Sequence, residues 1–312
     1  MTDQADYAKL IDDEIWAFIR KTEASYPADT VTATIARQRE IYDTMCADFE
    51  TPRPAGLAVT DRQFGGVRAR LYEPATAKVT VVYLHGGGFV VGGLHSHDGV
   101  CADLAQATGY RVVAADYRLA PEHRHPAAFD DTLAAIRAVG ERFGGPIVLA
   151  GDSAGGNLAA AAAHALRGSA LEIRGIVLIY PGLGFDRIGG SMARHAHAPM
   201  LTAADIDFYR EIRAPEGVSL ADDPTANPLA DDDFTGLPPA FVSAAECDPL
   251  ADDGPAYVAR ILAAGGSAQA IVEPGLVHGW LRARRMSARA EAAFARIVAA
   301  TQALGRGDWT PG

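Results

Sequence analysis

The chain has 312 residues, 49% of them hydrophobic, and a net charge of −11 at pH 7. This content predicts a globular protein with a sizeable core, in one large domain or two small ones, and excludes a disordered chain. An acidic chain without a long Lys/Arg cluster argues against nucleic acid as a partner. No apolar run reaches the length of a membrane span and no signal peptide is visible, so we expect a cytoplasmic location.

The cysteines are few and scattered. Cys46, Cys101 and Cys247 are odd in number and widely spaced. This pattern does not indicate a disulfide framework or a zinc site. We expect all three to be buried free thiols.

The first 50 residues predict helices. Apolar residues from Leu10 to Ile19 recur at helical spacing, the pattern breaks near residue 26, and a second helix is expected over Val31–Met45. From residue 67 the pattern changes to strands that alternate with helices. The expected strands are Val67–Tyr72, Val79–Leu84, Arg111–Ala115, Ile147–Ala150, Ile173–Tyr180, Ala240–Ala244 and Ala268–Val272, and the expected helices lie near 98–108, 128–143, 154–168, 251–264 and 286–304.

This alternation predicts an α/β protein with a mostly parallel sheet of about eight strands, covered by helices on both faces. The early strands lack intervening helices, so an antiparallel edge is expected at the start. Residues 183–235 interrupt the pattern with one helix near 202–213 and are too long for an ordinary loop. We expect residues 1–50 to form cap helices and residues 51–312 to form the main domain, with a cap insertion at about 183–235.

The most informative motif is Gly-Asp-Ser-Ala-Gly at residues 151–155. It follows the apolar run 147–150 and precedes an alanine-rich stretch that predicts a helix. Strand, Gly-x-Ser-x-Gly and helix in this order are typical of a nucleophile elbow, in which the Ser hydroxyl stands clear of the sheet. Flanking glycines are required there because a side chain would collide with the neighbouring strand or helix. We therefore expect Ser153 to be a nucleophile.

A glycine-rich loop follows the strand that ends at Leu84. The segment Leu-His-Gly-Gly-Gly-Phe at 84–89 lets the backbone turn its N–H groups toward one point. Such donors stabilise the negative oxygen of a tetrahedral intermediate. We assign this oxyanion hole to Gly87 and Gly88, with the N–H of Ala154. The dinucleotide and Walker patterns of phosphate loops do not fit this segment.

An elbow Ser also needs an orienting acid and a base, which follow it in the chain in that order. Asp248 comes after the expected strand Ala240–Ala244, where catalytic loops of open α/β sheets gather. Asp252 and Asp253 are rivals, although they resemble solvated residues in the first turn of the next helix. His278 follows the last expected strand and is the preferred base.

Three His-x-His pairs raise the alternative of a metal site. They are His95/His97, His123/His125 and His195/His197. No His-Glu-x-x-His is present, and no further ligand stands at the spacing expected after the first pair. We interpret these pairs as loop or pocket-rim residues and expect no metal.

Together these motifs resemble the bacterial members of the hormone-sensitive-lipase family of carboxylesterases, on the α/β-hydrolase fold. The resemblance spans about residues 65–305, whereas 1–50 and 183–235 match only in being cap-like. The segments that carry it are His-Gly-Gly-Gly at 85–88, Gly-Asp-Ser-Ala-Gly-Gly-Asn at 151–157, Asp-Pro-Leu at 248–250, His-Gly at 278–279, Tyr-Arg-Leu-Ala-Pro-Glu at 117–122 and Tyr-Pro at 180–181.

The resemblance implies a serine carboxylic ester hydrolase for short to medium acyl chains, acting through an acyl-enzyme without metal or organic cofactor. It implies that His85 and Gly86 support the oxyanion loop and that Glu122 is structural. Trp280 stands where the family often has Phe, which is expected to reshape the pocket. Small-molecule esters are the expected substrates, and relatives often pair as homodimers through the last strand.

Other functions stay open at this point. An amidase, deacetylase or lactonase would use the same triad, and the sequence does not separate them from an esterase. A small-molecule receptor of this family keeps the Ser and loses the catalytic His, whereas His278 is present here. A metallohydrolase would lose its activity in a chelator.

Overall fold

The computed structural model describes residues 5–27, 30–184 and 189–312, so small parts of both expected cap segments lie outside the described residues. Its strands form a single eight-stranded sheet in the order β1-β2-β4-β3-β5-β6-β7-β8. The strands β1 and β2 pair antiparallel, as do β2 and β4, and all other pairs are parallel. The strands are β1 (Ala58–Phe64), β2 (Val67–Glu73), β3 (Thr80–Leu84), β4 (Arg111–Ala115), β5 (Ile147–Asp152), β6 (Ile173–Ile179), β7 (Ala240–Cys247) and β8 (Ala268–Val277).

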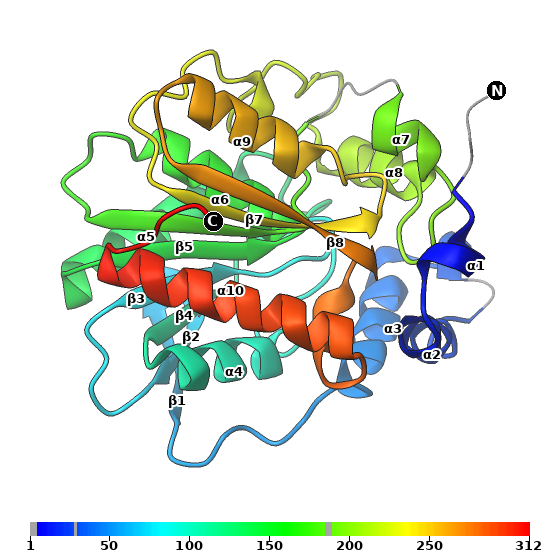
Figure 1. The fold of residues 1–312 in the computed structure, drawn as a ribbon, viewed down its shortest axis with the longest axis horizontal. Helices are drawn as coiled ribbons and strands as arrows, with labels where there is room; N and C mark the ends of the chain where they lie inside the picture. Colours follow the sequence, from blue (N-terminus) through cyan, green and yellow to red (C-terminus); the bar gives the residue numbers. More distant parts are fainter. Residues whose placement is uncertain (1–4, 28–29, 185–188) are drawn as a thin grey trace.

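Helices cover both faces of the sheet (Figure 1). On one face α4 (Asp98–Thr108) and α10 (Ala288–Arg306) pack on the sheet and share a core with α2 (Asp13–Glu23). The other face packs against α5 (Ala127–Phe143), α6 (Ala154–Ala165) and α9 (Asp253–Ala263). The central strands β3 and β5 are buried along their whole length, because both of their faces are covered.

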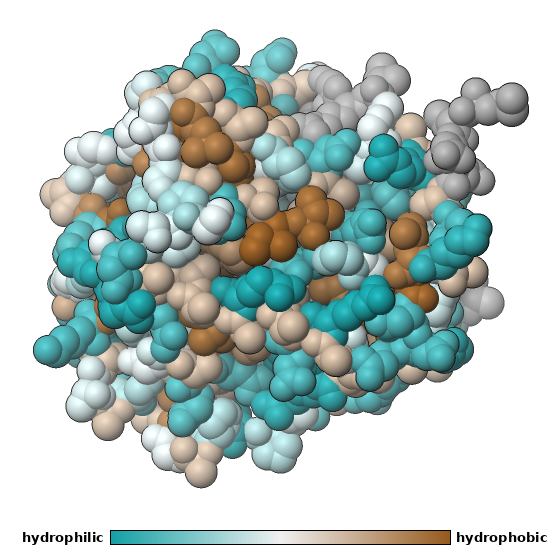
Figure 2. Space-filling view, viewed as in Figure 1, coloured by the Kyte–Doolittle hydropathy of each residue, from teal (hydrophilic) through white to brown (hydrophobic). Residues whose placement is uncertain are grey.

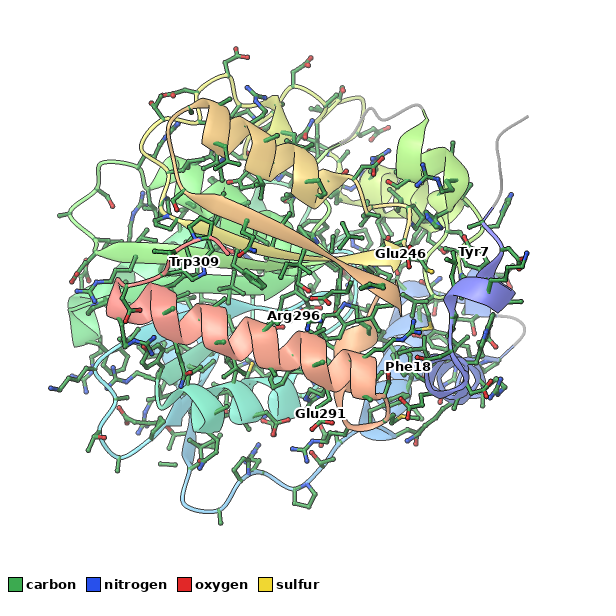
Figure 3. All side chains as sticks on the ribbon, in the orientation of Figure 1. Tyr7, Phe18, Glu246, Glu291, Arg296 and Trp309 are labelled. Carbon is green, nitrogen blue, oxygen red and sulfur yellow. The ribbon has the colours of Figure 1, made fainter. Side chains whose placement is uncertain are left out.

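A second group of helices lies beyond the carboxyl ends of the parallel strands, at the right in Figure 1. It brings the start of the chain beside the segment that follows β6. Its members are α1 (Tyr7–Leu10), α2, η1 (Thr30–Thr32), α3 (Ile35–Ala47), α7 (Gly190–Arg194) and α8 (Ala203–Arg213), while η2 (Pro228–Ala230) and η3 (Trp280–Arg285) are short connecting turns. Tyr7 of α1 bridges the two segments, because its hydroxyl is hydrogen-bonded to His195 at 3.2 Å (Figure 3).

The predicted fold class is confirmed, including the antiparallel edge, and the differences have local causes. The strand β1 was not predicted, because only Phe64 of its seven residues is buried and no apolar alternation marks it. The strand β8 runs five residues beyond the expected end, to Val277. The first helical stretch is divided, because the Asp12 side chain accepts a hydrogen bond from the N–H of Ile15 and starts α2 there.

Three further features concern the apolar surface, the cysteines and the helix lengths. Figure 2 shows apolar areas over α9 and β8, to which the exposed Leu262 and Val272 belong. The three cysteines are free and buried, as predicted. Within the described ranges no helix is long and apolar enough to cross a membrane.

We expect the substitution Leu149→Ala in β5 to destabilise the fold by about 2–5 kcal/mol, because Leu149 is fully buried and its loss leaves a cavity. The matched control is Leu262→Ala, whose side chain is half exposed on α9 and whose loss should cost less than about 0.5 kcal/mol. Urea unfolding followed by circular dichroism measures both. Equal losses in the two variants would contradict this account of the core.

Candidate active site

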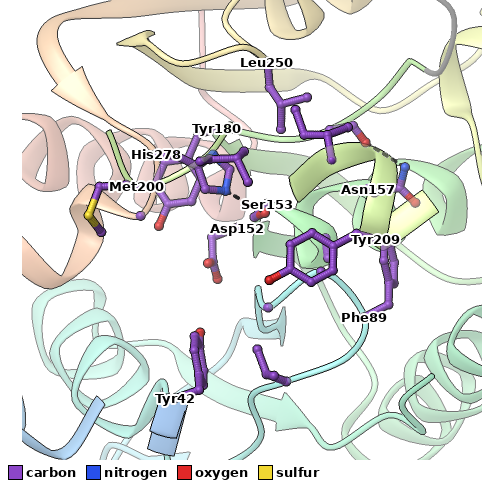
Figure 4. Close-up of a pocket in the computed structure, with 18 of the residues that line it drawn as sticks. Tyr42, Phe89, Asp152, Ser153, Asn157, Tyr180, Met200, Tyr209, Leu250 and His278 are labelled. Carbon is purple, nitrogen blue, oxygen red and sulfur yellow. Dashed lines mark hydrogen bonds between the residues drawn. The ribbon is translucent and has the colours of Figure 1, made fainter. Parts of the chain in front are cut away.

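A cavity of about 480 Å³ opens at the carboxyl ends of the parallel strands. A volume of this size is typical of small-ligand sites. Its floor is made by the loop after β3 and the end of β5, and its walls include α3 and α8 (Figure 4). The lining residues used below are Tyr26, Tyr42, Gly87, Gly88, Phe89, Asp152, Ser153, Ala154, Tyr180, Met200, Tyr209, Arg213, His278, Gly279 and Arg282.

Three of the predicted residues form one hydrogen-bonded chain at this floor. His278 Nε2 lies 2.8 Å from Ser153 Oγ, and His278 Nδ1 lies 2.7 Å from Asp248 Oδ2. Asp248 is buried, and its other oxygen accepts the N–H of Leu250 at 2.9 Å. The ring of His278 also packs on Tyr180, with 4.8 Å between ring centroids. The imidazole is therefore fixed between a buried carboxylate and the serine hydroxyl.

The turn around Ser153 has the expected strained form. Ser153 has φ 54° and ψ −118°, directly between β5 and α6. A Cβ on Gly155 would overlap the carbonyl of Leu84, and one on Gly151 would overlap the backbone of Gly155. Only glycine allows α6 to approach β3 this closely. The two motif glycines thus set the position of the serine relative to the loop after β3.

The loop after β3 turns back beside Ser153. Gly87 has φ 124° and Gly88 has φ 59°, values that favour glycine. A Cβ on Gly88 would overlap the ring of Tyr209 on α8, so this wall of the cavity closes directly on the loop. The amide of Gly86 is already engaged, because it donates to Asp152 Oδ1 at 3.0 Å.

Asp152 is the centre of a buried polar network behind the serine. Its carboxylate accepts hydrogen bonds from the Tyr83 hydroxyl at 2.8 Å, from the Gly86 amide, and from His97 Nε2 at 3.2 Å. Burial alone would raise the pKa of Asp152, but His97 and these donors hold that pKa below its ordinary value. The residue therefore stays charged and holds the glycine loop through Gly86.

His85 lies next to this network and supports the same loop. Its Nδ1 donates to the carbonyl of Gly86 at 2.8 Å, and its ring stacks on Tyr117 at 4.3 Å. The Tyr117 hydroxyl in turn donates to the His85 carbonyl at 2.7 Å. Burial and the neighbouring His97 lower the pKa of His85 to about 4, so the ring is neutral at pH 7.

Backbone strain is concentrated at the cavity. Within the described ranges, four residues other than glycine have positive φ: Phe89, Ser153, Tyr180 and Met200. All four line the cavity. Strain of this kind costs about 1–3 kcal/mol per residue and is typical of functional sites. It marks this end of the sheet independently of any motif.

The two rival acids have other roles, and their expected solvation is wrong for Asp253. Asp253 is buried, and its Oδ2 accepts the N–H groups of Leu183 and Gly184 at 2.6 and 2.9 Å. Asp252 accepts the N–H of Ser191 at 2.8 Å. Both carboxylates hold the segment after β6, because their partners lie there and not at His278.

The histidines of the three His-x-His pairs have different partners in the folded chain. His97 is buried against Asp152 and His195 is buried beside Tyr7, so neither is a rim residue, which corrects the interpretation from sequence. His95 pairs with Asp43 at 2.6 Å, and His125 with Asp223 at 3.1 Å. No group of three His, Cys, Asp or Glu side chains that could hold a metal ion occurs among the residues that the structure describes.

From the sequence alone, the aromatic residues and the methionine of the two expected cap segments could either line an acyl pocket or pack in the core of the cap. Tyr209 and Met200 line the cavity, whereas Phe18 and Trp16 pack in or against the core and Phe208 is exposed. Trp280 is fully buried against Tyr180 and does not itself line the cavity, so this ring contacts the pocket only through Tyr180.

Sequence reasoning missed three side chains of the cavity wall. Tyr42 on α3, Arg213 on α8 and Arg282 on η3 all line the cavity. They stand on segments that meet only in the folded chain, so no local motif marks them. Arg39 was also missed: it donates to the carbonyls of Val90 and Ala120 at 2.8 Å and pairs with Glu122, which ties α3 to the loop after Gly88.

Comparisons with known proteins identify the family to which this site belongs. Residues 81–282 match the family described as alpha/beta hydrolase fold. The chain belongs to this family. It is 38% identical over 300 residues to carboxylesterase NlhH of Mycobacterium tuberculosis, covering 89% of this chain and 90% of that protein. It is 35% identical over 260 residues to ethyl acetate hydrolase of Pseudomonas putida, covering 79% and 81%.

Solved structures of ester hydrolases also match this chain over most of its length. A hyperthermophilic esterase from the archaeon Pyrobaculum calidifontis matches with a TM-score of 0.86 at 30% identity, covering 95% of this chain and 99% of that one. An ester hydrolase from the metagenome of Lake Arreo, in complex with a bipyridine phosphonate derivative, matches with a TM-score of 0.85 at 34% identity, covering 95% and 99%. The expected α/β-hydrolase fold, carboxylesterase family and enzyme class are confirmed: the chain is an esterase.

We expect Asp152→Asn to lower stability and activity at neutral pH, because the Asn amide nitrogen would face one of three hydrogen-bond donors. The pKa of Asp152 lies below its ordinary value of 3.8, so its contribution to stability is complete above that pH. It declines as the pH falls through the lower folded value. The difference in unfolding free energy between wild type and variant should therefore shrink in acid.

Urea unfolding of both proteins at about pH 7 and about pH 3 measures this difference. The exposed Asp222→Asn is the matched control and should leave the unfolding free energy unchanged at neutral pH. A wild-type advantage of equal size at both pH values would contradict the role of the Asp152 charge.

Proposed function

We propose that the protein hydrolyses small-molecule carboxylic esters of short to medium acyl chain length, with Ser153 as nucleophile, His278 as base and Asp248 as orienting acid. The observation that carries the proposal is the continuous chain of hydrogen bonds from Asp248 through His278 to Ser153, at the floor of the 480 Å³ cavity. A nucleophile, a base within hydrogen-bond reach and a third group that orients the base are what covalent acyl transfer requires.

In the first step the Ser153 oxygen attacks the ester carbonyl, and its proton passes to His278 Nε2. The lone pair for this transfer is available because Nδ1 carries its proton toward Asp248, 2.7 Å away. The buried carboxylate then stabilises the imidazolium. The hydrogen bond from the N–H of Leu250 keeps Asp248 in place while His278 becomes charged.

The negative oxygen of the tetrahedral intermediate is held by the N–H groups of Gly87, Gly88 and Ala154. Removal of one such donor typically costs roughly 2.7–4 kcal/mol of transition-state stabilisation. Ala154 begins α6, whose N-terminus also favours negative charge. Gly86 and His85 keep the loop in this conformation, since the Gly86 amide binds Asp152 and its carbonyl binds His85.

Collapse of this intermediate breaks the ester C–O bond. His278 returns its proton to the leaving alcohol, and the acyl group stays on Ser153. Water then attacks the acyl-enzyme while His278 again takes a proton, and the carboxylic acid leaves. His278 thus acts as base in both attacks and as acid when the alcohol leaves.

The acyl and alcohol groups are enclosed by a cap on the main domain. We assign residues 1–50 and about 183–235 to this cap and residues 51–312 to the catalytic domain that carries the insertion. Support comes from the cavity lining, in which Tyr26 and Tyr42 belong to the first segment and Met200 and Tyr209 to the second.

We also infer that two copies of the chain pair through the outer edge of β8. This strand is last in the sheet and carries the exposed Val272. An unpaired edge with an apolar side chain favours pairing with a second strand. Light scattering after gel filtration should give the dimer mass for wild type and the monomer mass for Val272→Lys, and a monomeric wild type contradicts the inference.

Ser153→Ala should lower the hydrolysis of p-nitrophenyl esters by about a thousandfold or more, because the nucleophile is lost while the fold remains. The series from acetate to palmitate should show the highest kcat/KM for short to medium chains. The exposed Ser169→Ala is the matched control and should keep wild-type rates. A fully active Ser153→Ala would rule out this nucleophile.

A further inference from the structure

Arg282 is a cationic side chain in the wall of the cavity, four residues after His278 in the chain. Its Nη2 donates to the Tyr42 hydroxyl at 2.6 Å and to Cys46 Sγ at 3.4 Å. Burial raises the pKa of the Tyr42 phenol and of the Cys46 thiol, so both partners are neutral at pH 7. The guanidinium, which stays protonated in proteins, therefore keeps its charge without a bonded counter-ion.

The neighbouring arginines of η3 show the contrast. Arg284 and Arg285 both pair with Asp103, at 2.8 and 2.6 Å. No carboxylate in the described part of the chain lies within ion-pair distance of Arg282. The Asp152 carboxylate acts on Arg282 through space, without a hydrogen bond, and the Arg282 side chain is half-buried in the cavity wall. A charge in such a wall without a hydrogen-bonded counter-ion is placed to attract an anionic ligand.

One of the three guanidinium nitrogens of Arg282, Nη1, is available for such a ligand, because Nη2 is bonded to Tyr42 and Nε is buried. Nε is shielded from solvent and has no hydrogen-bond partner. Nη1 makes no hydrogen bond to a residue of the described ranges either. It lies close to Gly279, since a Cβ built on this glycine would be 3.9 Å from Nη1. The free Nη1 is thus beside the residue that follows His278.

Two more arginines, Arg210 and Arg213, line the cavity. Arg213 is buried in another part of the wall, with its guanidinium 3.7 Å from the ring centroid of Phe89. Burial lowers the pKa of Arg213 to about 9, so it remains charged at pH 7. The carboxylates that line the cavity are Asp152, already bound by three donors, and Glu23. The lining therefore has three arginines against two carboxylates, in a chain of net charge −11.

We propose that Arg282 binds a carboxylate on the substrate, so that the preferred esters carry a free carboxylate, as the half-esters of dicarboxylic acids do. A carboxylate accepts charge-assisted hydrogen bonds from the N–H groups of Nη1 and neutralises the guanidinium, which an uncharged group cannot do. The inference rests on the proposed function, because it names the substrate class of the same serine site.

A purely structural role for Arg282 makes a different prediction. Arg282 also anchors Tyr42, and loss of this anchor would disturb α3 and weaken the hydrolysis of all esters alike. A carboxylate-binding role weakens the anionic esters selectively and acts mainly on KM. The ratio between anionic and neutral substrates therefore separates the two roles.

The test compares the monoethyl esters of succinate, glutarate and adipate with ethyl butyrate, pentanoate and hexanoate. In each pair a methyl group replaces the carboxylate, and hydrolysis is followed by alkali uptake at constant pH. Wild type should favour the half-ester at one chain length or more, by about tenfold in kcat/KM, as expected for a hydrogen-bonded charge pair.

Arg282→Gln should abolish this preference, chiefly through a higher KM for the half-ester, and Arg282→Lys should restore part of it. The exposed Arg62→Gln has the same change in net charge and should keep the wild-type ratio. Competitive inhibition of wild type by glutarate, and weaker inhibition by the uncharged glutaramide, tests the same contact without any substitution.

Two results overturn the proposal. One is a wild-type enzyme that hydrolyses every neutral ester as fast as its anionic partner and is not inhibited by glutarate. The other is a parallel loss for both substrates in a folded Arg282→Gln. In either case, retained hydrolysis of the neutral esters that depends on Ser153 leaves the proposed function intact. Absence of all ester hydrolysis in wild type would instead refute the proposed function itself.

Discussion

The close approach of α6 to the end of β3 is the constraint on which the site depends. Only a hydrogen atom fits at residue 155, because a Cβ there would overlap the carbonyl of Leu84. In the parallel pairing of β3 and β5, Leu84 lies opposite Gly151, so both strands end at the same level. The serine after β5 and the glycine loop after β3 are consequently neighbours, and neither can move without opening this contact.

The same contact explains why a charge is buried beneath the nucleophile. Where two loops meet at the end of a sheet, their backbone N–H groups cannot all pair with strands. Asp152 accepts one of these groups, from Gly86, together with Tyr83 and His97. On the outer side Arg39 satisfies the carbonyls of Val90 and Ala120. Packing thus sets the position of the loop, and polar contacts from both sides set its conformation.

Sequence reasoning succeeded where a local pattern encodes the contact. The glycines of 151–155 mark the close approach, and the buried runs of β3 and β5 mark strands covered on both faces. Sequence reasoning failed where the residue that a side chain contacts is distant in the chain. Asp253 looked like a solvated first-turn acid, yet it binds the amides of Leu183 and Gly184 about seventy residues away. The strand β1 is exposed along most of its length, so it carries no apolar alternation.

The division between chemistry and selectivity follows from this architecture. The residues proposed to react stand directly after strands, where the sheet fixes them and local motifs reveal them. The walls come from α3, α8 and η3, which meet only in the folded chain. Arg282 connects the two parts, because it stands four residues after His278 and binds Tyr42 on α3. A change of substrate class can therefore arise in the walls without any change in the triad, and the charge of Arg282 is the wall feature that argues most directly for an anionic ester.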